Sequence, residues 1–147
     1  MKVKIKKALH DAKMPTYATD GSGCFDLYAA GISYKSTVAK NGLVIDTGLQ
    51  FEIPEGYVML VFSRSGQAFK HGVRLSNCVG VIDSDFRGNV KVKLHLDASF
   101  MPFLNVENGD RVAQAMIVPA PKVEFEFSDV LSDTNRGAGG FGSTGVA

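Results

Sequence analysis

Residues 90–97 read Val-Lys-Val-Lys-Leu-His-Leu-Asp. Apolar residues stand at every second position, and a period of two is that of a β-strand with one buried face. The same alternation occurs at Val3 and Ile5 and in residues 123–128, Val-Glu-Phe-Glu-Phe-Ser. Residues 58–62 are continuously apolar, which predicts a strand covered on both faces, in a sandwich or at a subunit contact.

Glycine and proline separate these segments at short intervals, a pattern that predicts an all-β protein: a sandwich, jelly roll or barrel. There is room for one short helix. We expect Ser65 to cap it, residues 67–71 to form it and Gly72 to end it in the left-handed conformation. Residues 136–147, the C-terminal arm, contain five glycines and should be ordered only by what they bind.

The composition fits one globular domain and excludes a disordered chain, since 45% of the 147 residues are hydrophobic. A net charge of +1 argues against binding to long nucleic acids. Cys24 and Cys78 form no CxxC pair, which predicts a reduced, cytoplasmic protein. The lysine-rich start has no apolar segment behind it, and no apolar run approaches membrane-spanning length, so we expect neither a secretory leader nor a membrane partner.

Two segments combine features of anion sites. The C-terminal arm contains an arginine, a phenylalanine and a serine among its glycines. It is either a disordered terminus or a flap that closes over a nucleotide. In the second case Arg136 would bind phosphate and Phe141 would stack on a base. Residues 62–66, Phe-Ser-Arg-Ser-Gly, are either a helix cap beside a solvated Arg64 or a phosphate site.

Three further segments carry polar groups next to strands. Residues 79–82 and 90–96 flank a turn and predict a hairpin. Its Asp83 either helps to make the turn or stands at the mouth of a pocket. Gln114 is either a satisfied buried amide or a ligand of phosphate or water. Asp26 needs a partner if buried, either an arginine or a metal ion.

Several common sites are missing from the sequence. It has no His/Cys cluster with metal spacing, no Gly-x-Ser-x-Gly elbow and no P-loop. A structural zinc site is therefore not expected.

Taken in order, these segments resemble the all-β dUTPase family, the homotrimeric deoxyuridine triphosphate nucleotidohydrolases. The similarity spans Gly23 to Gly145 and is closest in residues 63–66 (Ser-Arg-Ser-Gly), 80–88 (Gly-Val-Ile-Asp-Ser-Asp-Phe-Arg-Gly), 109–114 (Gly-Asp-Arg-Val-Ala-Gln) and 136–145 (Arg-Gly-Ala-Gly-Gly-Phe-Gly-Ser-Thr-Gly). The resemblance implies a distorted jelly-roll protomer of residues 1–135 in a three-fold trimer. It also implies that the C-terminal arm closes a neighbouring subunit's active site.

The resemblance further implies hydrolysis of dUTP to dUMP and pyrophosphate with Mg²⁺, which keeps uracil out of DNA and supplies dUMP for thymidylate synthesis. Asp83 matches the carboxylate that orients water for in-line attack on the α-phosphorus. Asp26 would reach the metal through water. The residues implied to contact phosphate are Arg64, Ser65, Gly66, Gln114 and Arg136.

Base and sugar selection are implied for the predicted hairpin. Asn77, Lys91 and main-chain groups of residues 81–83 (Val81, Ile82, Asp83) would pair with uracil. Phe86 stands where the family usually has Tyr, and its ring would pack on deoxyribose. Phe141, Gly142 and Ser143 would cover the bound nucleotide.

The sequence departs from the family's pattern at two further places, and three alternative functions compete with dUTP hydrolysis. Gly23-Cys24 replaces the usual Ala-Gly, and the loop at 97–108 is slightly long, with Phe100-Met-Pro-Phe103 in it. A dCTP deaminase, the sibling of the fold, needs a glutamate that residues 77–90 lack. A nucleotide-responsive regulatory protein would use the same dUTP site. A structural jelly roll explains the strands but not Asp83, Gln114 and the arm together.

Overall fold

The computed structural model describes residues 1–32, 36–38, 42–97, 104–141 and 143. Its strands in these ranges are β1 (Lys4–Lys7), β2 (Thr16–Tyr17), β3 (Phe25–Tyr28), β4 (Ser36–Val38), β5 (Leu43–Asp46), β6 (Leu49–Glu52), β7 (Tyr57–Phe62), β8 (Val73–Leu75), β9 (Val79–Ile82), β10 (Lys91–Leu96), β11 (Leu104–Val106) and β12 (Arg111–Pro119), and its helix is α1 (Ser65–His71). The predicted all-β fold with one short helix is confirmed.

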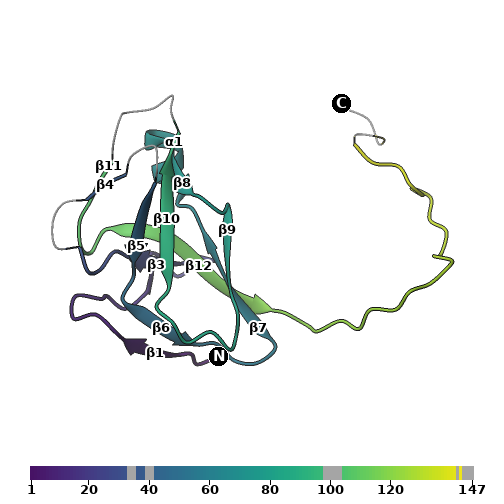
Figure 1. Ribbon diagram of the computed structural model, residues 1–147, viewed down its shortest axis with the longest axis horizontal. Helices are drawn as coiled ribbons and strands as arrows, with labels where there is room; N and C mark the ends of the chain where they lie inside the picture. The colour runs from purple at the N-terminus through teal and green to yellow at the C-terminus, as the bar shows by residue number, and fades with distance from the viewer. Residues whose placement is uncertain (33–35, 39–41, 98–103, 142, 144–147) are drawn as a thin grey trace.

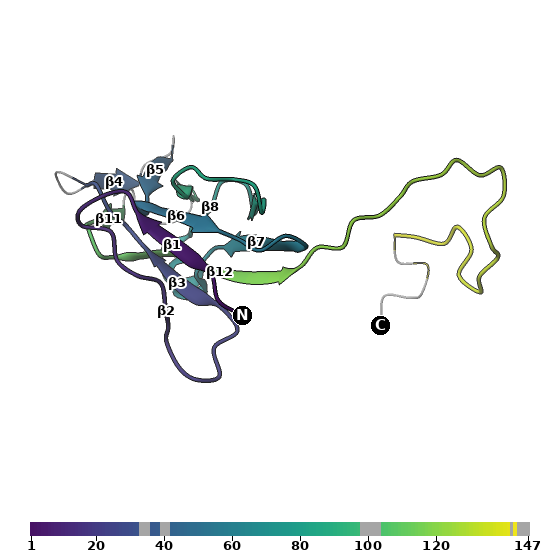
Figure 2. The ribbon, with the colours of Figure 1, turned by 90° about the horizontal axis from the view of Figure 1, so that it is seen from below.

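The strands form two main layers (Figures 1 and 2). One is a five-stranded sheet in the order β2-β3-β12-β7-β9, and the other is a three-stranded sheet in the order β5-β10-β8. Two-stranded ribbons, β1-β6 and β11-β4, complete the fold. The core contains Leu27 of β3, Met59 of β7 and Leu94 of β10, each at most 1% exposed.

The alternation in residues 90–97 has the predicted consequence. Val92, Leu94 and Leu96 are at most 5% exposed, whereas Lys91 and Lys93 point to the outside. The continuous apolar stretch of β7 behaves differently. Met59 and Val61 are buried, but Val58, Leu60 and Phe62 are only half-buried. Within one chain β7 is therefore fully covered on one face, and cover of its other face at a subunit contact stays a prediction.

The predicted hairpin of β9 and β10 is also wrong. β9 pairs with β7, and β10 pairs with β5 and β8, so the two strands belong to different sheets. The cause lies next to β10. The N–H of Val90 donates to the carbonyl of Leu49, and its carbonyl accepts bonds from the N–H and hydroxyl of Thr47. These bonds hold the start of β10 against the segment between β5 and β6 and separate it from β9.

The short helix α1 begins at Ser65, the residue that was expected to cap it. Arg64 takes the N-cap position with extended dihedral angles and no side-chain capping bond, so the prediction that Ser65 caps the helix is wrong. Gly72 ends α1 with φ of 63°, as predicted, and its N–H donates to the carbonyl of Ala68. In the part of the chain that the structure describes, no helix has the length and apolar character needed to cross a membrane.

The chain leaves the sheets after β12, and residues 121–138 are exposed (Figure 1). The strand predicted at residues 123–128 does not form, because the segment has no partner strand among the described residues. Val123, Phe125 and Phe127 are 65%, 91% and 107% exposed. Residues 120–135 are here called the linking segment, since they join β12 to the C-terminal arm.

The strand β1 lies at an edge of the fold and pairs only with β6 among the described strands. Ile5 is half-buried, as its alternation predicts, and Lys4 is exposed. The Nζ of Lys4 donates to the Oε1 of Glu52 over 3.0 Å. This hydrogen bond and the lysine charge lower the pKa of Glu52.

Candidate functional site

Asp26 is a buried carboxylate on β3 between two arginines. Its Oδ1 accepts a hydrogen bond of 3.2 Å from the Nε of Arg64, and its Oδ2 accepts one of 3.2 Å from the guanidinium of Arg111. The Asp26 side chain is 10% exposed. Of the two partners left open by the sequence, the structure shows the arginine pairing.

The turn that carries Arg64 is fixed to the beginning of β12. The carbonyl of Arg111 accepts hydrogen bonds from the guanidinium of Arg64 over 3.3 Å and from the amide of Gln67 over 3.0 Å. The amide of Gln114 donates to the carbonyl of Ser63 over 2.9 Å. Asp26, Arg64, Arg111 and Gln114 therefore form one group, here called the arginine cluster. Ser65 and Gly66 follow Arg64 in the chain.

A pocket of about 430 Å³ opens where β9 and β10 separate. This volume is in the usual range for small-molecule sites. Four of the residues predicted to select the base line it, namely Asn77, Val81, Ile82 and Lys91. The same divergence that breaks the predicted hairpin thus creates the space for a ligand between its strands.

Asp83 lies elsewhere, in the turn that follows β9. Its side chain is exposed and lines a second hollow of about 990 Å³, together with Tyr57 at the start of β7 and Lys122 of the linking segment. The Asp83 carbonyl accepts a bond of 3.2 Å from the N–H of Phe86, which closes the turn.

Asp83 and the arginine cluster lie at opposite ends of β7. In the β7–β9 register Ile82 is opposite Met59 and Val79 is opposite Phe62, so Asp83 lies beyond one end of the pairing. Arg64 comes two residues after Phe62, beyond the other end. The span from residue 58 to residue 64 is roughly 20 Å at about 3.3 Å per residue. One chain therefore does not bring Asp83 to the residues predicted to hold phosphate.

Residues 136–141 of the C-terminal arm are distant from both groups (Figures 1 and 2). Phe141 is 113% exposed and has a φ of 49°. Arg136 donates from its Nε to the carbonyl of Gly139 within the arm over 2.8 Å, and Ser143 is exposed. Gly142 and the loop residues 98–103 lie outside the described residues.

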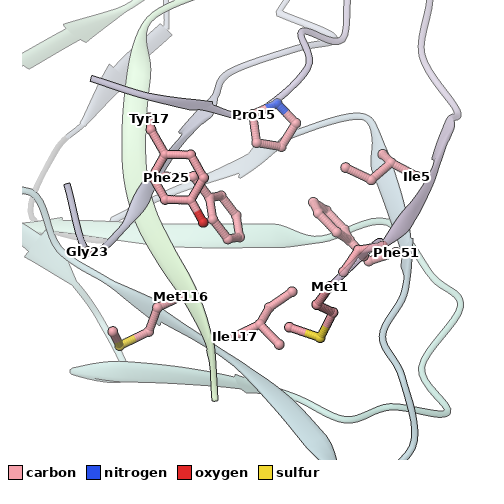
Figure 3. Close-up of a pocket in the computed structure, with 10 residues that line it drawn as sticks. Met1, Ile5, Pro15, Tyr17, Gly23, Phe25, Phe51, Met116 and Ile117 are labelled. Atoms are coloured by element: carbon pink, nitrogen blue, oxygen red, sulfur yellow. The ribbon is translucent and has the colours of Figure 1, made fainter. Parts of the chain in front are cut away.

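An apolar pocket of about 290 Å³ lies between β1, β3, β6 and β12 (Figure 3). It is lined by Met1, Val3, Ile5, Pro15, Tyr17, Gly23, Phe25, Phe51, Met116 and Ile117. No sequence pattern singled it out, because its residues come from distant parts of the chain. It has no charged side chain, so it does not resemble a phosphate site.

Arg111 and Gly88 are two residues that the sequence reasoning did not select. Arg111 lies in residues 109–114, and the sequence signal for it was Asp26, for which either an arginine or a metal ion was open as the partner. A Cβ on Gly88 would stand 2.6 Å from the Cζ of Phe86, which shows that the Phe86 ring packs on the Gly88 backbone. The sequence signal for that contact was the spacing of Phe86 and Gly88 in one turn.

The described residues contain no cluster of side chains that could bind a metal ion. No three His, Cys, Asp or Glu side chains come together anywhere in the described ranges. The acidic residue implied to reach the metal, Asp26, has each of its oxygens bonded to a guanidinium.

Comparison with known proteins agrees with this architecture. A family profile described as dUTPase matches residues 10–145. The deoxyuridine 5'-triphosphate nucleotidohydrolase of Nautilia profundicola is 45% identical over 149 residues, covering 99% of each chain, and that of Desulfitobacterium hafniense is 44% identical over 151 residues, covering 100% of this chain and 98% of the relative. The Staphylococcus bacteriophage 80alpha dUTPase, solved with dUPNHPP, superposes with a TM-score of 0.86 at 26% identity, covering 99% of each chain. The chain therefore belongs to the dUTPase family.

Proposed function

We propose that this protein hydrolyses dUTP to dUMP and pyrophosphate at sites assembled from neighbouring copies of a homotrimer. Family membership and the names of the relatives support the reaction. One observation supports the proposal that the site is shared between copies: Asp83 and the arginine cluster lie at opposite ends of β7 in one chain. A ring of identical copies places such separated surfaces against each other.

In this proposal the pocket between β9 and β10 holds uracil, with Asn77, Val81, Ile82 and Lys91 around it. Asp83 orients a water molecule for in-line attack on the α-phosphorus. As the new P–O bond forms, the bond from the α-phosphorus to the bridging oxygen breaks, and pyrophosphate leaves. Asp83 accepts the proton of the water, a role that contributes about 10²–10⁴-fold to the rate.

A second copy supplies the phosphate-binding groups. Arg64, Ser65, Gly66 and Gln114 would stabilise the negative charge that develops on the phosphates. The C-terminal arm comes from another copy, with Arg136 and Ser143 on phosphate and with Phe141 and Gly142 over the base. The distance of residues 136–141 from the sheets of their own chain supports this assignment.

The linking segment supports an assembly of copies on separate grounds. Phe125 and Phe127 are almost fully exposed, whereas apolar side chains of this size are normally covered. The free edge of β1 and the apolar pocket of Figure 3 offer a surface for an added strand. The lysines of β1 are complementary in charge to Glu124 and Glu126. A neighbouring copy's linking segment fits this surface.

Mg²⁺ enters the proposal as an ion that accompanies the triphosphate. Magnesium usually keeps several waters and binds substrate phosphates, so it does not need a cage of protein side chains. Because the arginine cluster does not fit a cation, no step is assigned to the metal.

The proposed role in the cell follows from the reaction. Removing dUTP keeps uracil out of DNA, and the dUMP formed is the precursor for thymidylate synthesis. A cytoplasmic location is part of the proposal and rests on the two cysteines, Cys24 and Cys78, which are unpaired in the structure.

The direct test of the reaction is release of pyrophosphate from dUTP, dTTP, dCTP and UTP, each with Mg²⁺ and with a chelator. We expect release from dUTP, at least about 100-fold slower release from the others, and loss of release with the chelator. No release from any of them, in a protein that still binds dUTP, would favour the regulatory role and contradict the proposed reaction.

The contact between Phe86 and Gly88 predicts an effect on sugar selection. In Gly88→Ala the new methyl group displaces the Phe86 ring, which in this proposal packs against deoxyribose and excludes a 2′-hydroxyl. We expect the preference for dUTP over UTP, measured as a ratio of kcat/KM values, to fall by about 10-fold.

Gly21→Ala is the matched control for this substitution, because a Cβ there meets nothing within 4 Å. It should leave the preference unchanged. A Gly88→Ala protein with the parent's preference would show that the ring does not select the sugar.

A further inference from the structure

Asp26 occupies the most buried position among the charged groups of the arginine cluster. Its side chain is 10% exposed, compared with 23% for Arg64 and 48% for Arg111. A buried carboxylate requires partners, and here each oxygen has a guanidinium donor. The two arginines therefore hold Asp26, and Asp26 in turn holds them.

The orientation of Arg64 depends on these bonds. Its Nε donates to Asp26 over 3.2 Å, and its Nη1 donates to the carbonyl of Arg111 over 3.3 Å. A guanidinium has five N–H donors in a rigid plane, so two fixed bonds set the direction of the remaining donors. Those remaining donors are the ones that a phosphate can use.

Arg111 holds the opposite side of the same carboxylate. It bonds to the Oδ2 of Asp26, and its carbonyl accepts bonds from Arg64 and Gln67. Arg111 thus contacts both the carboxylate and the turn of Arg64, and it prevents the carboxylate from rotating away.

The charge of this cluster suits a polyphosphate and not a cation. One carboxylate and two guanidinium groups leave one net positive charge, whereas a Mg²⁺ site requires oxygen ligands with negative charge. Within the described ranges no further carboxylate or histidine joins Asp26 to form a set of metal ligands.

We propose that Asp26 is a positioning residue that orients Arg64 toward the phosphates, with Arg111 holding its second oxygen, and that it does not act through the metal. This inference rests on the proposed function, because it assigns Arg64 to the substrate phosphates. It adds Arg111 to the residues on which phosphate binding depends.

The test is the affinity for dUpNHpp. In this analogue an NH group replaces the oxygen that bridges the α- and β-phosphates, where the proposed hydrolysis would break the bond. Asp26→Asn keeps the side-chain shape and removes the charge that holds both arginines. If Asp26 acts through Arg64, its loss should weaken binding by about 10- to 100-fold, and by the same factor with Mg²⁺ and with a chelator. The Mg²⁺ concentration that half-saturates activity should not change.

The two roles of Asp26 differ in a double-mutant cycle with Arg64→Met. If Asp26 acts only through Arg64, Asp26→Asn should cause little further loss of affinity, at most about twofold, in a protein that already carries Arg64→Met. If Asp26 acts through the metal, the two losses should multiply. If Asp26 has only a structural role, Asp26→Asn should lower the melting temperature both in the parent protein and in the Arg64→Met protein. The loss of affinity caused by Asp26→Asn should then also persist in the Arg64→Met protein.

Asp97→Asn is the matched control, because Asp97 accepts a bond of the same length, 3.2 Å, from the Nε of Arg74 in an exposed pair. It should leave dUpNHpp affinity unchanged. If Asp26→Asn does not fold, Arg111→Lys replaces it, with an expected loss of several-fold that is again equal with and without Mg²⁺.

A loss of affinity in Asp26→Asn that appears only with Mg²⁺, or no loss at all, would overturn the inference. Neither outcome bears on the reaction itself. Failure of the parent protein to release pyrophosphate from dUTP would instead contradict the proposed function.

Discussion

Asp83→Asn is expected to lower kcat for dUTP by about 10²–10⁴-fold, because an amide does not accept the proton of the attacking water. The affinity for dUpNHpp should stay close to that of the parent, since Asp83 lies outside the pocket between β9 and β10. Single-turnover hydrolysis and equilibrium binding measure the two quantities separately.

Asp85→Asn is the control in the same turn. Asp85 lines the same hollow as Asp83 and is exposed, but no role in the reaction is assigned to it. We expect the kcat of this variant to stay near the parent value. Unchanged turnover in Asp83→Asn would remove Asp83 from the mechanism.

Deletion of residues 136–147 should produce a folded protein with a kcat/KM for dUTP lowered by about 100-fold or more. It removes the base-stacking ring of Phe141, and stacking on an aromatic side chain contributes about 1–3 kcal/mol per base. It also removes the positive charge of Arg136. Steady-state kinetics with dUTP measures this loss.

The melting temperature of the truncated protein should match that of the parent. Residues 136–138, Phe141 and Ser143 are exposed, and the hydrogen bonds of the arm's described residues stay within residues 134–143. Full activity after the deletion would show that the arm takes no part in catalysis. A large loss of stability would show that the arm contributes to the stability of the fold.

The local features of the fold were predictable because they depend on neighbouring residues. The alternation in residues 90–97 determined which side chains of β10 are buried, and Gly72 ended α1 as its conformational freedom allows. Asp26 on a strand between apolar residues correctly indicated a buried carboxylate that needs a partner, and it left open whether that partner is an arginine or a metal ion.

The errors concern partners that local sequence does not specify. The residues of β9 and β10 favour strands, but contacts of Val90 with residues 47 and 49 decide that they enter different sheets. Residues 123–128 have the pattern of a strand, yet no strand of the same chain pairs with them among the described residues. Arg111 was missed for the same reason, since its partner Asp26 lies 85 positions away.

The central claim is that dUTP is hydrolysed at sites shared between copies. Its most direct test is to mix unfolded Asp83→Asn chains with unfolded chains that lack residues 136–147, refold them together and measure pyrophosphate release. Each variant alone should be nearly inactive. A site that takes Asp83 from one copy and the arm from another should regain about one quarter of the parent activity by random assembly of a closed trimer. A refolded mixture no more active than the two variants apart would contradict the shared site.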